Sequence, residues 1–326
     1  MQLTLYNASG EPQDIPTLKE FEERDLELRS RGEWFWVDVE GATSLEMVEF
    51  ARHFDIHRMT ADDCLNRLAP VKIEMAEDYL FLVTHVLNFN EGWDKLETLN
   101  LSFILFKECC ITVHSQPVRS VAIAARQMKG ENCQSLNGSF KVLYLTLQAI
   151  MGFYAELVED VCEDVDTLED SVMEGQIESS LLQNVASSAR HLAVVRRRLV
   201  PTRRVLERLC EEGEAFLDPE ARIYLRDALD GVIRLIEKGT VIRDALNTAQ
   251  SNHLAHLSNQ TNAVMRTLSV VATIMMPLTF VTSLFGMNVK VPGQEVDGLF
   301  YFNCIVGGML VLTLLMILIF RRRGWF

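Results

Sequence analysis

Residues Asp218 to Asn288 read DPEARIYLRDALDGVIRLIEKGTVIRDALNTAQSNHLAHLSNQTNAVMRTLSVVATIMMPLTFVTSLFGMN. The stretch opens with Asp218 and Pro219, an N-capping residue followed by the residue favoured at the first helical position. Only Pro277 interrupts the chain after that, and apolar residues recur at intervals of three and four, which is helical spacing. We therefore expect one helix of about 67 residues, roughly 100 Å long at 1.5 Å per residue.

The C-terminal part of this helix contains no charged residues. Thr267–Val289 and Gly298–Phe320 contain no Asp, Glu, Lys or Arg, and each exceeds the ~20 residues that cross ~30 Å of hydrocarbon. We predict two transmembrane helices, residues 266–288 and 298–320, joined by an external loop at 289–297. A buried hairpin in a soluble core is the alternative, but the second segment is apolar on every face.

Positive charge predicts the orientation of these spans. Arg266 precedes the first span, and Arg321, Arg322 and Arg323 follow the second within a basic tail at residues 321–326. The positive-inside rule then places both termini in the cytoplasm. The N-terminus is polar and strand-like, so no signal peptide is expected.

Composition restricts the remaining functions. The net charge of −14 argues against nucleic acid as a partner and suits a protein that handles cations. The 7 cysteines form no CxxC pair, so reduced structural thiols are expected. The sequence contains no Gly-rich nucleotide loop and no HExxH or GxSxG motif. We predict neither an enzyme nor a cofactor.

Residues 1–135 mix helical and strand-like patterns and predict a cytosolic α/β domain with one sheet. Helical spacing occurs at residues 45–54, 59–68 and 118–128. The strand-like runs are short and rich in β-branched and aromatic residues. They are Leu3–Tyr6, Phe35–Val39, Tyr79–Leu87, Leu99–Leu105 and Cys110–Val113.

Residues 136–217 read as helix only, with a reversal of charge. Glu156–Glu174 is strongly acidic and has no basic residue, whereas residues 190–208 are rich in arginine, and Gly175 between them marks a turn. An antiparallel hairpin could pair its acidic arm with its basic arm. The charges could instead be solvated helix faces, or they could concentrate cations and limit their exit.

One uncharged face of the long helix continues into the first span. Such a stripe either packs against another helix through its small and hydroxyl residues, or lines a pore when several copies surround an axis. The residues alone leave both readings open. Stepping by three or four, the stripe contains Asn262, Met265, Leu268 or Ser269, Ala272, Met276, Thr279 and Ser283, and it ends near Asn288.

The tripeptide Gly286-Met287-Asn288, followed by a short loop, a second span and a basic end, resembles the signature of the CorA family of divalent cation transporters, also called the two-transmembrane GxN family. The resemblance covers nearly the whole chain. Further stretches fit the family pattern, namely His57–Asp63, Val71–Glu74, Ser258–Met265 and Ala272–Phe280.

The resemblance implies an α+β membrane protein of the bacterial inner membrane, multi-pass, that assembles as a funnel-shaped homopentamer. Each chain would contribute a cytosolic αβα domain, a helical hairpin, a stalk helix at residues 218–265 and two C-terminal spans. The first span would line the pore, and the Asn288 ring beside Gly286 and Met287 would bind a hydrated ion. Further implied pore residues are Thr279, Met276 and Asn262, with Met265, Leu268 and Met276 as apolar gates that dewet.

The implied function is transport of a divalent cation, Mg²⁺ or Zn²⁺ with Co²⁺ and Ni²⁺ as further candidates. The partners are then other copies of the chain, the bilayer and the cation. A non-conducting, membrane-anchored interaction or regulatory protein on the same scaffold is the alternative. The loop from Val289 to Glu295 is more similar to the zinc-transporting branch, so the ion is left open.

Two features of the long helix bear on regulation. Some relatives use a carboxylate there in an inter-subunit metal site, but the matching position is Ser251. His253 and His256 are three residues apart and could bind zinc between subunits, or could be ordinary helix histidines.

Overall fold

The computed structural model describes residues 1–8, 10–88, 98–129, 136, 138–174, 179–213, 216–287 and 298–325. These residues form two compact units, Met1–Thr248 and Ala249–Phe326, and one helix contributes to both. Asn288, the loop 289–297 and the expected turn at Gly175 lie outside the described residues.

A seven-stranded mixed sheet forms the centre of the first unit, with strand order β2-β1-β3-β7-β6-β5-β4. Among the described strands, β3 and β7 pair in parallel, and the other neighbours are antiparallel. The strands are β1 Gln2–Asn7, β2 Pro12–Ile15, β3 Phe35–Glu40, β4 Lys72–Met75, β5 Leu80–Leu87, β6 Thr98–Leu105 and β7 Cys109–His114.

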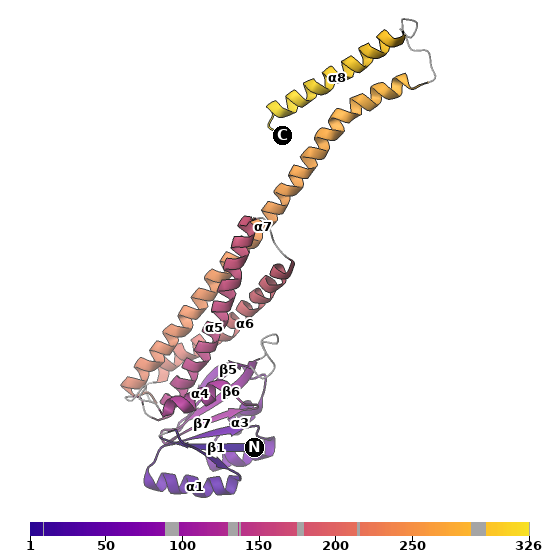
Figure 1. The fold of residues 1–326 in the computed structure, drawn as a ribbon. Helices are drawn as coiled ribbons and strands as arrows, with labels where there is room; N and C mark the ends of the chain where they lie inside the picture. The colour runs from indigo at the N-terminus through magenta and orange to yellow at the C-terminus, as the bar shows by residue number, and fades with distance from the viewer. Residues whose placement is uncertain are drawn as a thin grey trace. The chain divides into compact units, whose positions relative to one another are not determined.

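Helices cover both faces of this sheet (Figure 1). Side chains of α1, α2 and α3 share one apolar core with β1, β3 and β7, while α4 packs on α5, which contacts β5, β6 and β7. The helices are α1 Leu18–Arg31, α2 Ser44–His53, α3 Arg58–Leu65, α4 Arg119–Met128, α5 Ser139–Glu174, α6 Ser179–Glu212, α7 Pro219–Phe285 and α8 Gly298–Arg322.

The sequence predicts most of these elements. All five expected strands and the three helices at α2, α3 and α4 are confirmed. Every residue of β5 and β7 is buried, which is why these strands read as continuous apolar runs rather than alternating ones. The strands β2 and β4 and the helix α1 were not predicted.

The long helix is also found as one element. α7 runs without a break for 67 residues, and Pro277 lies inside it. The boundary between the two compact units falls within α7, after Thr248.

The contacts of α5 and α6 differ from the predicted charge pairing. Among the described residues, no ion pair joins a carboxylate of α5 to an arginine of α6. Glu159 of α5 instead pairs with Lys238 of α7, and two α6 arginines pair within their own helix, Arg203 with Glu207 and Arg208 with Glu212. Buried Val, Leu and Ile side chains hold the two arms together.

One arginine of the basic run attaches α6 to the sheet. Arg198 Nη1 donates to His85 Nδ1 of β5 at 2.9 Å, and His85 Nε2 donates to the Ala69 carbonyl at 3.0 Å. Burial lowers the pKa of His85, and the positive charge of Arg198 lowers it further. A neutral His85 is the only form that accepts the arginine hydrogen bond while donating to Ala69.

A buried polar network joins β3 to β7. Trp36 Nε1 donates to Thr112 Oγ1 at 2.9 Å, and Thr112 donates to Asp38. His114 Nε2 lies 3.0 Å from an Asp38 oxygen, and its Nδ1 lies 2.8 Å from the Gln116 carbonyl. Both ring nitrogens face acceptors, so the charged imidazolium satisfies both contacts.

Stability of the first unit is therefore expected to depend on pH through His114. Burial alone lowers the pKa of His114, but Asp38 more than offsets this and the net pKa is raised. A raised folded-state pKa gives stabilisation that is complete below the unfolded value of about 6.5 and is lost as pH rises through the folded pKa.

Thermal unfolding followed by tryptophan fluorescence tests this expectation. The wild-type protein should lose stability between pH 6 and pH 9, and His114→Gln should be less stable at pH 6 by roughly 1–3 kcal/mol. The variant should lose most of the pH dependence as well. An identical slope in both proteins would show that His114 is not the titrating group.

Candidate functional site: the exposed face of α7

In the part of the chain that the structure describes, three helices are long and apolar enough to cross a membrane, and they differ in burial. The apolar window of α5 is 61% buried, whereas that of α7 is 6% buried and that of α8 is 0% buried. The apolar window of α5 therefore belongs to a protein core. The other two expose apolar surface that water would not tolerate, as spanning helices do.

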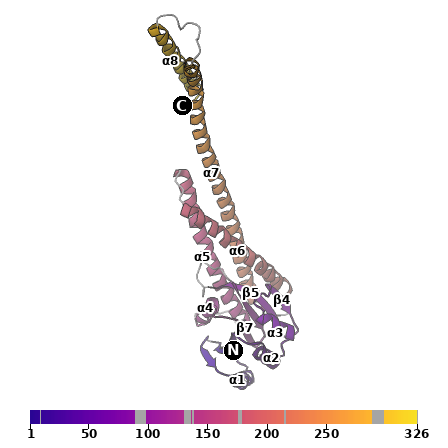
Figure 2. The same ribbon diagram turned by 90° about the vertical axis from the view of Figure 1, so that its right-hand side faces the viewer.

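Within the second unit, α8 runs back alongside the end of α7 (Figures 1 and 2). One face of α7 is partly covered: Val270 is buried, and Ile274, Leu278, Val281 and Phe285 are half-buried. The spacing of three and four puts these five positions on one side of the helix.

The predicted uncharged stripe lies on the opposite side of α7. Met265 is 56% exposed, Leu268 is 61% exposed and Met276 is 76% exposed. At 3.6 residues per turn, the stripe and the covered positions are about half a turn apart. Asn262, Ala272, Thr279 and Ser283 complete the stripe and are all exposed. Either use of the stripe, helix packing or a pore wall, requires such a free face in a single chain.

Hydroxyl groups on α7 are oriented by their own helix. Thr279 Oγ1 donates to the Met275 carbonyl at 2.8 Å, and Thr273 and Thr282 donate to carbonyls four residues earlier. With its proton committed to the helix, the Thr279 oxygen has only acceptor lone pairs left. An acceptor on the stripe suits the water shell of a cation, whose hydrogens point outward.

The GMN motif begins directly after α7. The Gly286 N–H donates to the Thr282 carbonyl at 2.9 Å, so the glycine continues the helical hydrogen bonding. A Cβ at this position would lie 3.2 Å from the Thr282 oxygen, so a larger residue would require a shift of a few tenths of an ångström. Met287 is 58% exposed. Asn288, the predicted ligand ring, is outside the described residues.

The described part of the chain offers no inner-sphere metal site. No group of three or more His, Cys, Asp or Glu residues comes together there. His253 and His256 are both half-buried, and no third ligand of these types joins them within one chain. The polar groups that the stripe itself offers are amides and hydroxyls, with thioether and alkyl groups between them.

Comparison with known proteins shows which family and which relatives this chain resembles. The family described as CorA-like Mg2+ transporter protein matches residues 31–322. A cobalt/magnesium transport protein CorA from Thermotoga maritima is 27% identical over 318 residues, covering 95% of this chain and 90% of that protein. A putative metal ion transporter from Bacillus subtilis is 25% identical over 293 residues, covering 90% of each.

Solved structures show the same fold. The complete CorA magnesium transporter from Methanocaldococcus jannaschii superposes with a TM-score of 0.79 at 18% identity, covering 100% of this chain and 99% of that one. Full-length CmaX gives 0.76 at 16% identity, covering 100% and 98% of the two chains. The ZntB cytoplasmic domain from Vibrio parahaemolyticus gives 0.61 at 14% identity, covering 79% and 98%.

Proposed function

Because the chain belongs to the CorA family, we propose that it transports divalent cations, Mg²⁺ first among them, across the membrane through the central pore of a homopentamer. The observation that carries the proposal is the exposed, uncharged face of α7 that leads to the GMN motif. A relative that aligns over 95% of this chain is named a cobalt/magnesium transport protein.

In the proposed pentamer the stripe of each chain faces the central axis. Rings of Asn288, Thr279 and Asn262 would present oxygens to the waters of a hydrated ion, and Mg²⁺ gives up those waters reluctantly. Met265, Leu268 and Met276 would form apolar rings between the polar ones. Such rings close a pore by dewetting and open when it widens slightly.

The chemistry of the stripe suits a hydrated divalent cation rather than a directly coordinated one. Inner-sphere zinc sites use Cys, His or carboxylate ligands, and the stripe from Asn262 to Asn288 contains none of them. An uncharged pore that reads hydrated ions also admits Co²⁺ and Ni²⁺. We therefore place the selectivity in the hydrated size of the ion rather than in direct coordination.

Flux into proteoliposomes that contain an ion-sensitive dye tests the choice of cation. Mg²⁺, Co²⁺, Ni²⁺ and Zn²⁺ are compared at equal concentration, with and without a pH gradient. We expect Mg²⁺ flux that does not depend on the pH gradient. Zn²⁺ flux alone, or flux that needs the gradient, would contradict the proposed hydrated-ion pore.

The stalk part of α7 gives a separate prediction about regulation. Ser251 is exposed on α7. The family resemblance implies that this is the position where some relatives use a carboxylate for a regulatory metal. Ser251→Asp should therefore make transport more sensitive to inhibition by internal Mg²⁺, by roughly tenfold for one added charged ligand. Ser251→Asn is the uncharged control. If the wild-type protein and both variants gave the same inhibition curve, this position of the stalk would have no part in regulation.

A further inference from the structure

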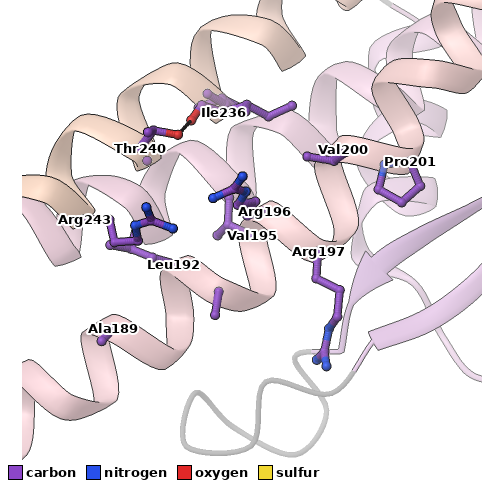
Figure 3. Close-up of a pocket in the computed structure, with 13 residues that line it drawn as sticks. Ala189, Leu192, Val195, Arg196, Arg197, Val200, Pro201, Ile236, Thr240 and Arg243 are labelled. Atoms are coloured by element: carbon purple, nitrogen blue, oxygen red, sulfur yellow. Dashed lines mark hydrogen bonds between the residues drawn. The ribbon is translucent and has the colours of Figure 1, made fainter.

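A groove between α6 and α7 in the first unit has the dimensions of a ligand site (Figure 3). Its volume is about 430 Å³, within the roughly 300–1,000 Å³ typical of small-molecule sites. Its walls are aliphatic, formed by Leu192, Ala193, Val195 and Val200 of α6 and by Leu235 and Ile236 of α7.

Arginines border these apolar walls, and no acidic side chain lines the groove with them. In Figure 3, Arg196 and Arg243 lie between α6 and α7, whereas Arg197 points away from α7. No carboxylate among the groove residues faces them. Within the described chain, Arg196 has no ion pair, and Arg243 approaches only its neighbour Asp244, at 3.6 Å and largely exposed to solvent. Two guanidinium groups therefore share a groove that holds no negative charge.

We propose that this groove binds the anion of a medium-chain fatty acid. The carboxylate would lie between Arg196 and Arg243, because guanidinium groups bind carboxylates through paired, charge-assisted hydrogen bonds. The hydrocarbon chain would lie along the aliphatic walls. The ligand would touch both helices, and so it would tie α6 to the helix that continues into the membrane span.

The lining argues against other small anions. No aromatic side chain lines the groove, so a nucleobase would find nothing to stack on. Thr240 is the one uncharged polar side chain in the lining, and its hydroxyl already donates to the Ile236 carbonyl at 2.8 Å. Sugar hydroxyls and base edges would therefore find few partners other than the arginines, whereas an acyl chain needs none.

The acidic face of α5 from a second copy is a poorer fit. Its exposed side chains include Glu163, Asp166 and Asp170, which match the arginines in charge. They offer no apolar group to the aliphatic walls. A second copy seated in the groove would exclude the fatty acid, and the test below would then show no labelling of the groove peptides.

Photolabelling of the full chain in lipid nanodiscs tests the proposal. The probe is dodecanoate with a diazirine at the end of its chain, and mass spectrometry locates the labelled peptides. We expect labelling of the peptides around Leu192–Val200 and Leu235–Arg243, suppressed by excess dodecanoate but not by dodecanol or acetate. Arg196→Gln and Arg243→Gln should each lower it at least about tenfold, whereas the control Arg204→Gln, outside the groove, should not.

A substitution that fills the groove tests the proposed site independently, because it leaves both arginines in place. A Cβ on Gly239 would lie 3.8 Å from Leu192 Cδ2, so Gly239→Ala fits and Gly239→Phe should occupy the groove. Labelling should persist in the first variant and disappear in the second. Unlabelled α6 and α7 peptides in the wild-type protein, or equal competition by dodecanol or by acetate, would overturn the proposal. Transport activity is not needed for this readout.

Discussion

Asn288→Ala should reduce Mg²⁺ flux at least about 100-fold, to near the level of empty vesicles, while the oligomer still assembles. The change removes the amide ring proposed to hold the hydrated ion, and each lost hydrogen bond to a charged species is worth about 1.5–3 kcal/mol. The backbone and the apolar contacts of the spans are unaffected. Flux is measured with a Mg²⁺-sensitive dye, and assembly by light scattering in detergent.

Asn303→Ala is the matched control for this variant. Asn303 is exposed on α8, outside the proposed pore, so the same chemical change should leave flux unaltered. Undiminished flux in Asn288→Ala would rule out the amide ring. Equal losses in both variants would point to general damage to the spans rather than to an ion site.

Met276→Ser should raise resting Mg²⁺ flux by about tenfold, which corresponds to ~1.4 kcal/mol removed from the barrier. Met276 is 76% exposed and is the most exposed of the three proposed apolar gates. A hydroxyl in place of each thioether would hydrate the narrow part of the pore and hinder its dewetting. The measurement is dye-reported Mg²⁺ influx into proteoliposomes, compared with that of the wild-type protein at the same protein density.

Val271→Ser controls for the position on the helix. Val271 is 52% exposed on the same helix but lies about a third of a turn away from the stripe. It should leave resting flux unchanged. If Val271→Ser increased flux and Met276→Ser did not, the pore would be lined by a different face of α7.

The elements with one dominant pattern could be predicted from the sequence. α7 follows from the Asp218–Pro219 start, the helical spacing and the long absence of prolines. β5 and β7 follow from β-branched runs that are buried on both faces. Which residues share the uncharged stripe of α7 could also be predicted, because residues three and four apart share a helix face whatever surrounds it. Their exposure in the single chain is seen only in the structure.

The missed elements had weaker signals. α1 is dominated by charged residues. Phe21 and Leu28 are its buried apolar side chains, and Leu18 packs against the same core while only partly buried. The capping residues of α1 are visible in the sequence as Thr17 and Gly32. In the structure Thr17 accepts a hydrogen bond from the Glu20 N–H, and Gly32 has a left-handed φ of 66°. β2 and β4 are four residues long and lie at the two edges of the sheet, where burial imposes little pattern.

Long-range partners could not be predicted from spacing alone. The sequence suggested that the acidic and basic arms pair with each other, but Glu159 pairs with Lys238 of α7 and Arg198 contacts His85 of the sheet. A run of like charges attracts any segment of opposite charge, so it does not show which helix or strand it will contact. The groove around Arg196 and Arg243 was missed for the same reason, since its two walls are far apart in the chain.

Mg²⁺ influx into proteoliposomes under an imposed membrane potential tests the central claim most directly. A passive pore should carry Mg²⁺ inward when the inside is negative, since 100 mV contributes about 4.6 kcal/mol for a divalent ion. We predict influx well above that of empty vesicles, which rises with the potential and falls to the level set by the concentration gradient alone when the potential is collapsed. Influx equal to that of empty vesicles at every potential, with Mg²⁺, Co²⁺, Ni²⁺ and Zn²⁺ alike, would contradict transport and favour a non-conducting protein on this scaffold.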